Sequence, residues 1–223
     1  MAWFESENKR KTNSLKPEST TSFETGLDLR FLKDRASLSF TYYNKNTKNQ
    51  ILTSTINGVS GYGEALFNAG EVKNWGYEVT LGVVPFRNKD WEWKVDINWA
   101  KNNSEVVSLA NGMDYMTLTT VQNSVELRIV KGEPLVSLYC REPWKTNDEG
   151  QVLVGANGRP LSGEAKFLAS VEPKWTGSIR TSLRWKDLTF SAMLDIRMGG
   201  HVWSETAFQS SRNAQSIMSL GGR

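Results

Sequence analysis

The 223-residue sequence has one cysteine, one histidine and no long apolar run, and each shortage excludes a class of protein. Cys140 alone cannot form an internal disulfide or a cysteine-based metal cluster. His201 alone argues against a histidine metal site and against a histidine-based catalytic triad. No segment approaches the roughly 18 consecutive apolar residues that a membrane-spanning helix needs, and the mean hydropathy is −0.46. The sequence therefore predicts no membrane helix, no disulfide and no histidine-dependent chemistry.

An excess of charge of one sign is also missing, since 27 Lys and Arg stand against 24 Asp and Glu. The basic residues are scattered along polar strand faces and turns, which argues against nucleic-acid binding. The first residues carry no apolar signal-peptide core, and the last residues do not end on a strand. We therefore expect the chain to be a fragment of a longer polypeptide.

What the sequence does contain is alternation at period two, most clearly over residues 91–102. One side of this segment carries Trp91, Trp93, Val95, Ile97 and Trp99. The other side carries Glu92, Lys94, Asp96, Asn98 and, after a one-residue slip that we expect at Ala100, Lys101. Because side chains alternate across a strand, the pattern predicts a ribbon with one apolar and one charged face.

Tryptophans at both ends of two such ribbons favour lipid as the solvent of the apolar face. Trp91 and Trp99 would lie about 20 Å apart along the axis of a tilted barrel, and Trp175 and Trp185 about 25 Å apart. The outward apolar band of an outer-membrane barrel is about 25 Å tall and is flanked by aromatic girdles. We therefore predict that these four tryptophans form a membrane girdle in contact with outer-membrane lipid.

Six ribbons of this kind predict an all-β fold, an antiparallel up-and-down meander that forms part of a transmembrane β-barrel with long extracellular loops. We expect residues 1–223 to form one partial-barrel domain with strands at about 20–31, 36–46, 72–84, 91–102, 175–185 and 188–198. The remaining segments read as a polar connection at 44–70, a long loop region at 103–173 and a final loop at 201–223.

The lengths of the connections alternate along the chain. Short turns join the first strand to the second, the third to the fourth and the fifth to the sixth, so all of them would lie at one rim. Outer-membrane barrels have short periplasmic turns and long external loops. This predicts Trp91 and Trp185 at the periplasmic rim, and Trp99 and Trp175 at the outer rim.

No catalytic constellation emerges from the residues, and we predict a protein that is not an enzyme and has no metal or cofactor. Glu24 and Asp28 share a polar strand face but lie about 13 Å apart, too far for either usual glycosidase geometry. Asp148 and Glu149 fit a loop turn better than a calcium site. Flat rings on exposed loops can stack on sugars. The candidate ligand-binding residues are Tyr62, Tyr115, Tyr139, Trp144 and Trp203, although packing within the loops would also explain them.

Several segments carry a family likeness. LKPESTTSFETGLDLRFLKDRASLSFTYYNKNTKNQIL, NAGEVKNWGYEVTLGVVP and WEWKVDINWAKN resemble the C-terminal barrel region of SusC-like (RagA-like) TonB-dependent outer-membrane transporters of Bacteroidetes. VKGEPLVSLY and VEPKWTGSIRTSLRWKDLTFSAMLDIRMGGHVW look like the same family, so the likeness spans about residues 15–203. The most specific part is the ordered series of Leu-Lys-Pro-Glu, Glu-x-Gly-Leu-Asp and Tyr-Tyr-Asn.

The resemblance implies an outer-membrane barrel of about 22 strands around a plug, and uptake of glycans or oligopeptides that is energised through TonB. It also implies a SusD-like lipoprotein partner over the outer face. We find no plug, TonB-contact segment or closing strand in this sequence. An alternative remains, in which the same ribbons bury their apolar faces against each other in a soluble β-sandwich that binds carbohydrate or serves adhesion.

Overall fold

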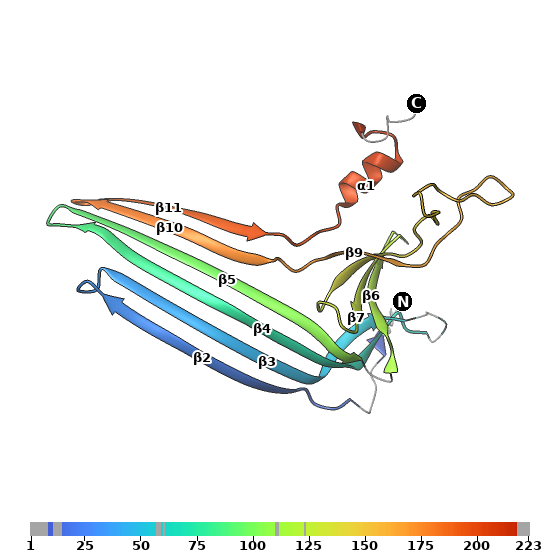
Figure 1. The fold of residues 1–223 in the computed structure, drawn as a ribbon, viewed down its shortest axis with the longest axis horizontal. Helices are drawn as coiled ribbons and strands as arrows, with labels where there is room; N and C mark the ends of the chain where they lie inside the picture. Colours follow the sequence, from blue (N-terminus) through green and yellow to red (C-terminus); the bar gives the residue numbers. More distant parts are fainter. Residues whose placement is uncertain are drawn as a thin grey trace, which may run out of the picture.

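The computed structural model describes residues 9–10, 15–56, 59, 61–109, 112–122 and 124–217. Its main feature is a curved antiparallel sheet with the strand order β11-β10-β5-β4-β3-β2 (Figure 1). Its long strands are β2 (Ser19–Phe31), β3 (Ala36–Thr55), β4 (Glu64–Arg87), β5 (Trp91–Leu109), β10 (Trp175–Trp185) and β11 (Leu188–Met198). A short strand, β1 (Lys9–Arg10), pairs in parallel with the start of β4. The predicted antiparallel meander is confirmed, and it forms an open segment of a barrel wall.

The apolar positions of the six long strands align in register into one continuous surface, which we call the apolar face. One row across the sheet consists of Leu29, Leu38, Leu81, Ile97, Ile179 and Leu194. Ile179 is 41% exposed and Phe190, on the same face, is 66% exposed. A β-sandwich would bury these side chains against a second sheet. The soluble-sandwich alternative is therefore wrong for this arrangement.

A polar atom on the apolar face is satisfied within the face itself. Trp93 lies on this face, and its indole N–H donates a hydrogen bond to the hydroxyl of Thr181 at 2.9 Å. Hydrocarbon offers no acceptor to an exposed N–H, so such a group needs a partner from the protein. The bond explains why a threonine occupies a position in an otherwise apolar row, opposite Val95.

The two ends of the large sheet differ (Figure 1). One end, which we call the turn end, carries the three short connections at 32–35, 88–90 and 186–187. The opposite end, the loop end, carries the long connections, a smaller sheet and helix α1 (Glu205–Arg212). The predicted alternation of short and long connections is therefore present in the fold.

β3 and β4 are longer than predicted, and the expectation of a polar connection over 44–70 is wrong. The two strands pair with each other as far as Thr55 and Glu64. The register shifts near Asn49, whose φ is +56°, and near Gly70, whose φ is +130°. A β-bulge adds a residue to one strand and reverses the alternation beyond it. A pattern with strict period two therefore stops at these positions although the strands continue.

The predicted loop region at 103–173 contains a second sheet, so that expectation is also wrong. This small sheet has the order β6-β7-β8-β9, with β6 (Tyr115–Val121), β7 (Val125–Val130), β8 (Ser137–Cys140) and β9 (Lys166–Ser170). Ile129 of β7 packs against Val106 and Leu109 at the loop end of β5. Val106 lies on the same side of β5 as Ser104, the side opposite the apolar face. The small sheet is thus fixed to the polar side of the large sheet.

Two further expectations are corrected at the ends of the strands. The register of β4 and β5 is continuous through Ala100, so no slip occurs there, and Lys101 lies on the apolar face beside Tyr77. A lysine at this margin can lay its methylene stem along apolar surface while its ammonium reaches water or lipid headgroups. The final segment, predicted as loop, contains α1, which is capped by the Ser204 side chain.

No helix in the described part of the chain is both long and apolar enough to cross a membrane.

Candidate functional site

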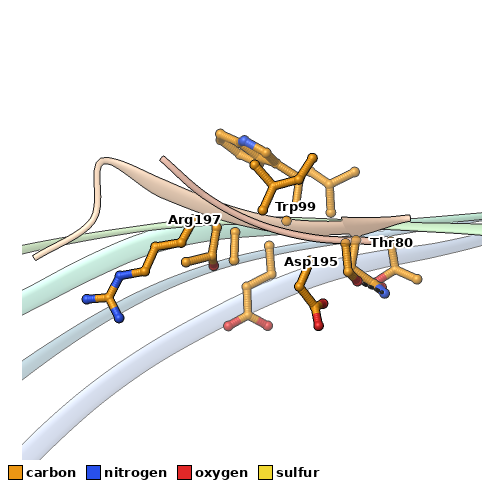
Figure 2. Close-up of a pocket in the computed structure, with 12 residues that line it drawn as sticks. Thr80, Trp99, Asp195 and Arg197 are labelled. Carbon is orange, nitrogen blue, oxygen red and sulfur yellow. Dashed lines mark hydrogen bonds between the residues drawn. The ribbon is translucent and has the colours of Figure 1, made fainter. Parts of the chain in front are cut away.

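The side of the large sheet opposite the apolar face carries polar and charged residues, and we call it the polar face. In the middle of the sheet, Trp99 lies on one side while Asp195 and Arg197 lie on the other (Figure 2). The Thr80 hydroxyl donates a hydrogen bond to the side-chain oxygen of Asn98 at 3.0 Å, which links β4 to β5 on this face. In a barrel segment such a face lines the interior, where water solvates its charges.

A groove on the polar face lies toward the loop end. It is lined by Glu24, Thr41, Tyr43, Lys45, Asn74, Glu78 and Asn102. Gly76 lies opposite both Tyr43 and Asn102. Because Gly76 has no side chain, the Tyr43 phenol lies across β4, and a Cβ atom at Gly76 would be 2.5 Å from the phenol oxygen. This phenol donates a hydrogen bond to the Asn102 side-chain oxygen at 2.9 Å, which fixes the ring in the groove.

The four tryptophans predicted as a girdle lie near opposite margins of the apolar face. Trp91 and Trp185 are cross-strand partners at the turn end, and their rings stack with centroids 5.6 Å apart. Toward the loop end, Trp99 is the cross-strand partner of Gly177. The Trp175 ring lies over the same glycine, 3.3 Å from where a Cβ atom would be. This geometry is compatible with a girdle, and contact of these rings with lipid headgroups stays a prediction.

The five aromatic residues predicted to bind ligand do not form one cluster. Tyr62, Tyr115 and Trp144 are 39%, 50% and 67% exposed, so a ligand or partner can reach them. Tyr139 is only 9% exposed. Trp203 is half-buried and donates its indole N–H to Glu205 of helix α1. We retain Tyr62, Tyr115 and Trp144 as candidate ligand contacts. Tyr139 and Trp203 contact other residues of this chain, and these contacts explain their positions without a ligand.

A polar cluster in the small sheet explains why Tyr139 is buried. The Arg128 guanidinium lies between two rings, 4.3 Å from the centroid of Tyr115 and 5.0 Å from that of Tyr139. Arg128 also forms a salt bridge with Glu126 at 2.6 Å. The Tyr139 hydroxyl donates a hydrogen bond to Glu133. Buried charges are tolerated when they are paired and hydrogen-bonded, so this cluster stabilises the small sheet.

The surroundings of Tyr139 predict a pH dependence of stability. Burial of the phenol and its hydrogen bond to the Glu133 carboxylate raise the pKa of Tyr139 to about 12, from an ordinary value of 10.0. The folded state therefore disfavours the tyrosinate form. The resulting stabilisation is complete below pH 10 and is lost as the pH rises from 10 through about 12. Ultraviolet titration of tyrosinate absorbance, with Tyr139→Phe as the reference, should show one phenol that ionises near pH 12. Ionisation of that phenol near pH 10 would contradict the burial argument.

Trp144 belongs to a projection, residues 143–166, in which backbone hydrogen bonds join positions eight residues apart, at Lys145, Leu153 and Leu161. The N–H of Lys145 donates to the carbonyl of Leu161, Leu161 donates to Leu153, and Leu153 donates to Lys145, at 2.8–2.9 Å. Each of these residues thus bonds to the next around a closed ring. Among the described residues, residues 143–163 form their hydrogen bonds within the projection itself. The ring explains how a segment without a buried core holds Trp144 in an exposed position.

Among the described residues, no group of three or more His, Cys, Asp or Glu side chains could hold a metal ion. The residues that sequence reasoning missed are those of the groove. Tyr43 lies on the polar face, and its position across β4 depends on Gly76, which lies 33 positions further along the chain. An aromatic residue on a polar face opposite a strand glycine is the signal that would have indicated it.

The arrangement of an apolar face, a polar face and two unlike ends defines the class of outer-membrane β-barrel walls. The family model described as "TonB dependent receptor-like, beta-barrel" matches residues 5–217. The chain therefore belongs to the β-barrel family of TonB-dependent receptors, which are outer-membrane proteins, and this is a family of receptors and transporters, not of enzymes.

Individual relatives agree with this assignment. TonB-dependent receptor P3 of Formosa agariphila is 24% identical over 220 residues, which cover 88% of this chain and 22% of that protein. TonB-dependent receptor SusC of Bacteroides thetaiotaomicron is 29% identical over 107 residues, which cover 48% of this chain and 11% of that protein. The chain thus spans about a fifth of the length of the first of these relatives.

A solved structure shows the same fold. The structure titled "Structure of the RagAB peptide transporter" superposes with a TM-score of 0.62 at 23% identity, over 80% of this chain and 21% of that chain. A second structure of the RagAB peptide importer, in an "open-open" state, superposes with a TM-score of 0.61 at 22% identity and covers 83% of this chain and 21% of that chain. Both show that the large sheet of this chain has the fold of part of a transporter barrel wall.

Proposed function

We propose that residues 1–223 form part of the wall of an outer-membrane transporter that imports glycans or oligopeptides, with energy delivered through TonB to regions outside this chain. The observation that carries the proposal is the register of the large sheet. From the turn end as far as the row of Trp99, six strands place their apolar side chains on one face and their charges on the other. Such a wall separates hydrocarbon from a wet interior through which a polar solute can pass.

In this proposal the turn end faces the periplasm and the loop end faces the exterior. The small sheet and the projection would then stand at the outer mouth, where a substrate arrives. A SusD-like lipoprotein is the proposed partner at this mouth. Trp144 supports that role because it is 67% exposed on a segment that its own hydrogen bonds hold in shape.

Uptake by cells tests the proposed function directly. The complete gene product, expressed in an outer membrane, should import labelled maltoheptaose or labelled short peptides in cells with TonB and not in isogenic cells without TonB. The control is a porin-permeable monosaccharide, whose entry should be equal in both strains. Equal uptake of the larger probes with and without TonB would contradict the proposal, as would recovery of the protein as a detergent-free soluble monomer.

A further inference from the structure

We infer that the groove on the polar face is a substrate-contact site for an oligopeptide, which it binds through both signs of charge. The inference rests on the proposed function, because it names the substrate class that the transporter would select. It concerns the groove around Tyr43 and not the exposed aromatics of the loops.

The position of the groove supports this role. Asn74 and Ser104 are cross-strand partners, and Gly76 and Asn102 form the next row of the same face toward the turn end. The Ser104 hydroxyl accepts a hydrogen bond from the N–H of Leu135, at 2.7 Å, in the segment between β7 and β8. The small sheet is therefore attached in the row of Asn74, which is the loop-end row of the groove. A solute that passes the small sheet toward the turn end meets the groove next.

The walls of the groove are shaped by fixed contacts. The hydrogen bond from Tyr43 to Asn102 holds the phenol across Gly76. The Lys45 ammonium lies 5.5 Å from the centroid of the same ring. An aromatic ring and a neighbouring ammonium that are already placed need little reordering when a ligand binds, and less ordering favours affinity.

The charges of the groove decide the class of ligand. Glu24 and Glu78 supply carboxylates and Lys45 supplies an ammonium, and none of the three has an ion-pair partner among the described residues. A charged group that loses water on binding is compensated best by an opposite charge. An oligopeptide offers an ammonium, a carboxylate and backbone amides that match the amides of Asn74 and Asn102. A neutral glycan offers hydroxyl groups alone.

Calorimetry on the purified complete gene product tests the inference. The probes are short synthetic peptides with free termini, the same peptides with both termini blocked, maltoheptaose and a sulfated oligosaccharide. Free peptides should bind, and blocking the termini should weaken binding about tenfold or more, since hydrogen bonds to charged groups are stronger than those between neutral groups. Lys45→Gln and the double variant Glu24→Gln/Glu78→Gln should each remove most of the difference between free and blocked peptides.

The matched control is Lys101→Gln, which removes an ammonium next to Asn102 in the chain but on the apolar face, and it should leave peptide affinity unchanged. Peptide affinity that is unaffected by the groove variants would overturn the inference, as would Lys45-dependent binding of the sulfated oligosaccharide in place of peptides. TonB-dependent uptake that persists in the groove variants would overturn the role of the groove in peptide binding and leave the proposed function intact. Peptide binding that depends on the groove, without TonB-dependent uptake, would overturn the proposed function and leave the peptide site intact.

Discussion

Ile179→Arg should destabilise the assembled protein by about 2–4 kcal/mol, because the change places a cation near the middle of the hydrocarbon layer. Ile179 lies on β10 between Ile97 and Leu194, and 41% of its surface is exposed on the apolar face. The measurement is denaturant unfolding of the complete gene product in lipid bilayers. The loss should appear as a lower midpoint with little change in slope.

The matched control is the adjacent position on the other face. Ser178→Arg adds the same side chain one residue away, on the polar face, where water can solvate it. We expect a change within about 0.5 kcal/mol, as for ordinary surface substitutions. Equal losses for the two variants would show that both faces meet the same environment, and the assignment of lipid to one face would fail.

Gly76→Val should cost about 3 kcal/mol or more, because the new side chain has no room. A Cβ atom at this position would lie 2.4 Å from the carbonyl oxygen of Lys101 and 2.5 Å from the Tyr43 phenol oxygen. The phenol can rotate away, but the carbonyl belongs to the backbone of β5, so the strands must separate locally. The yield of folded protein in the membrane should fall sharply. It is measured as the fraction that stays folded in denaturing detergent when the sample is not heated.

Thr80→Val, two rows away on the same strand and face, is the control for Gly76→Val. It loses one hydrogen bond to Asn98 and adds no bulk, so a cost of about 1 kcal/mol is expected. If Gly76→Val were as mild as this control, then the Tyr43 ring would not lie against β4 as described, and the shape of the groove would have to be revised.

The sequence was sufficient to predict the large sheet wherever alternation is uninterrupted. β10 and β11 have the predicted bounds, and Trp91 pairs with Trp185 as their predicted common rim requires. Each of these strands keeps the same alternation of apolar and polar residues along its whole length. The residue type at each position therefore indicates directly which face it lies on.

The parts that could not be predicted depend on interactions across long stretches of sequence. The bulges near Asn49 and Gly70 reverse the face of the following residues, which hides the loop-end halves of β3 and β4 from a pattern of period two. The small sheet was missed for a different reason. Its strands are short, and β7 is buried on both faces, with Glu126 and Ile129 at 7% and 1% exposure, so no clean alternation marks it.

The groove could not be predicted either, because it also depends on pairing between strands that are distant in the sequence. Tyr43, Gly76 and Asn102 come from three strands, and only the cross-strand register brings them together. The aromatic loop residues were easier to find, because exposure on a connection follows from local composition. Of these, Tyr139 is buried instead by its cross-strand partner Glu126 and by Arg128, both of which lie on β7.

The most direct test of the central claim, that the apolar face meets hydrocarbon and the polar face meets water, is thiol labelling in intact membranes. Single-cysteine variants at Ile97 and Ile179 on the apolar face, and at Asn98 and Ser178 on the polar face, would be made in the complete gene product without other reactive thiols. A water-soluble maleimide should label the cysteines of the polar face and spare those of the apolar face. Equal labelling of all four positions, or the reverse pattern, would contradict the central claim.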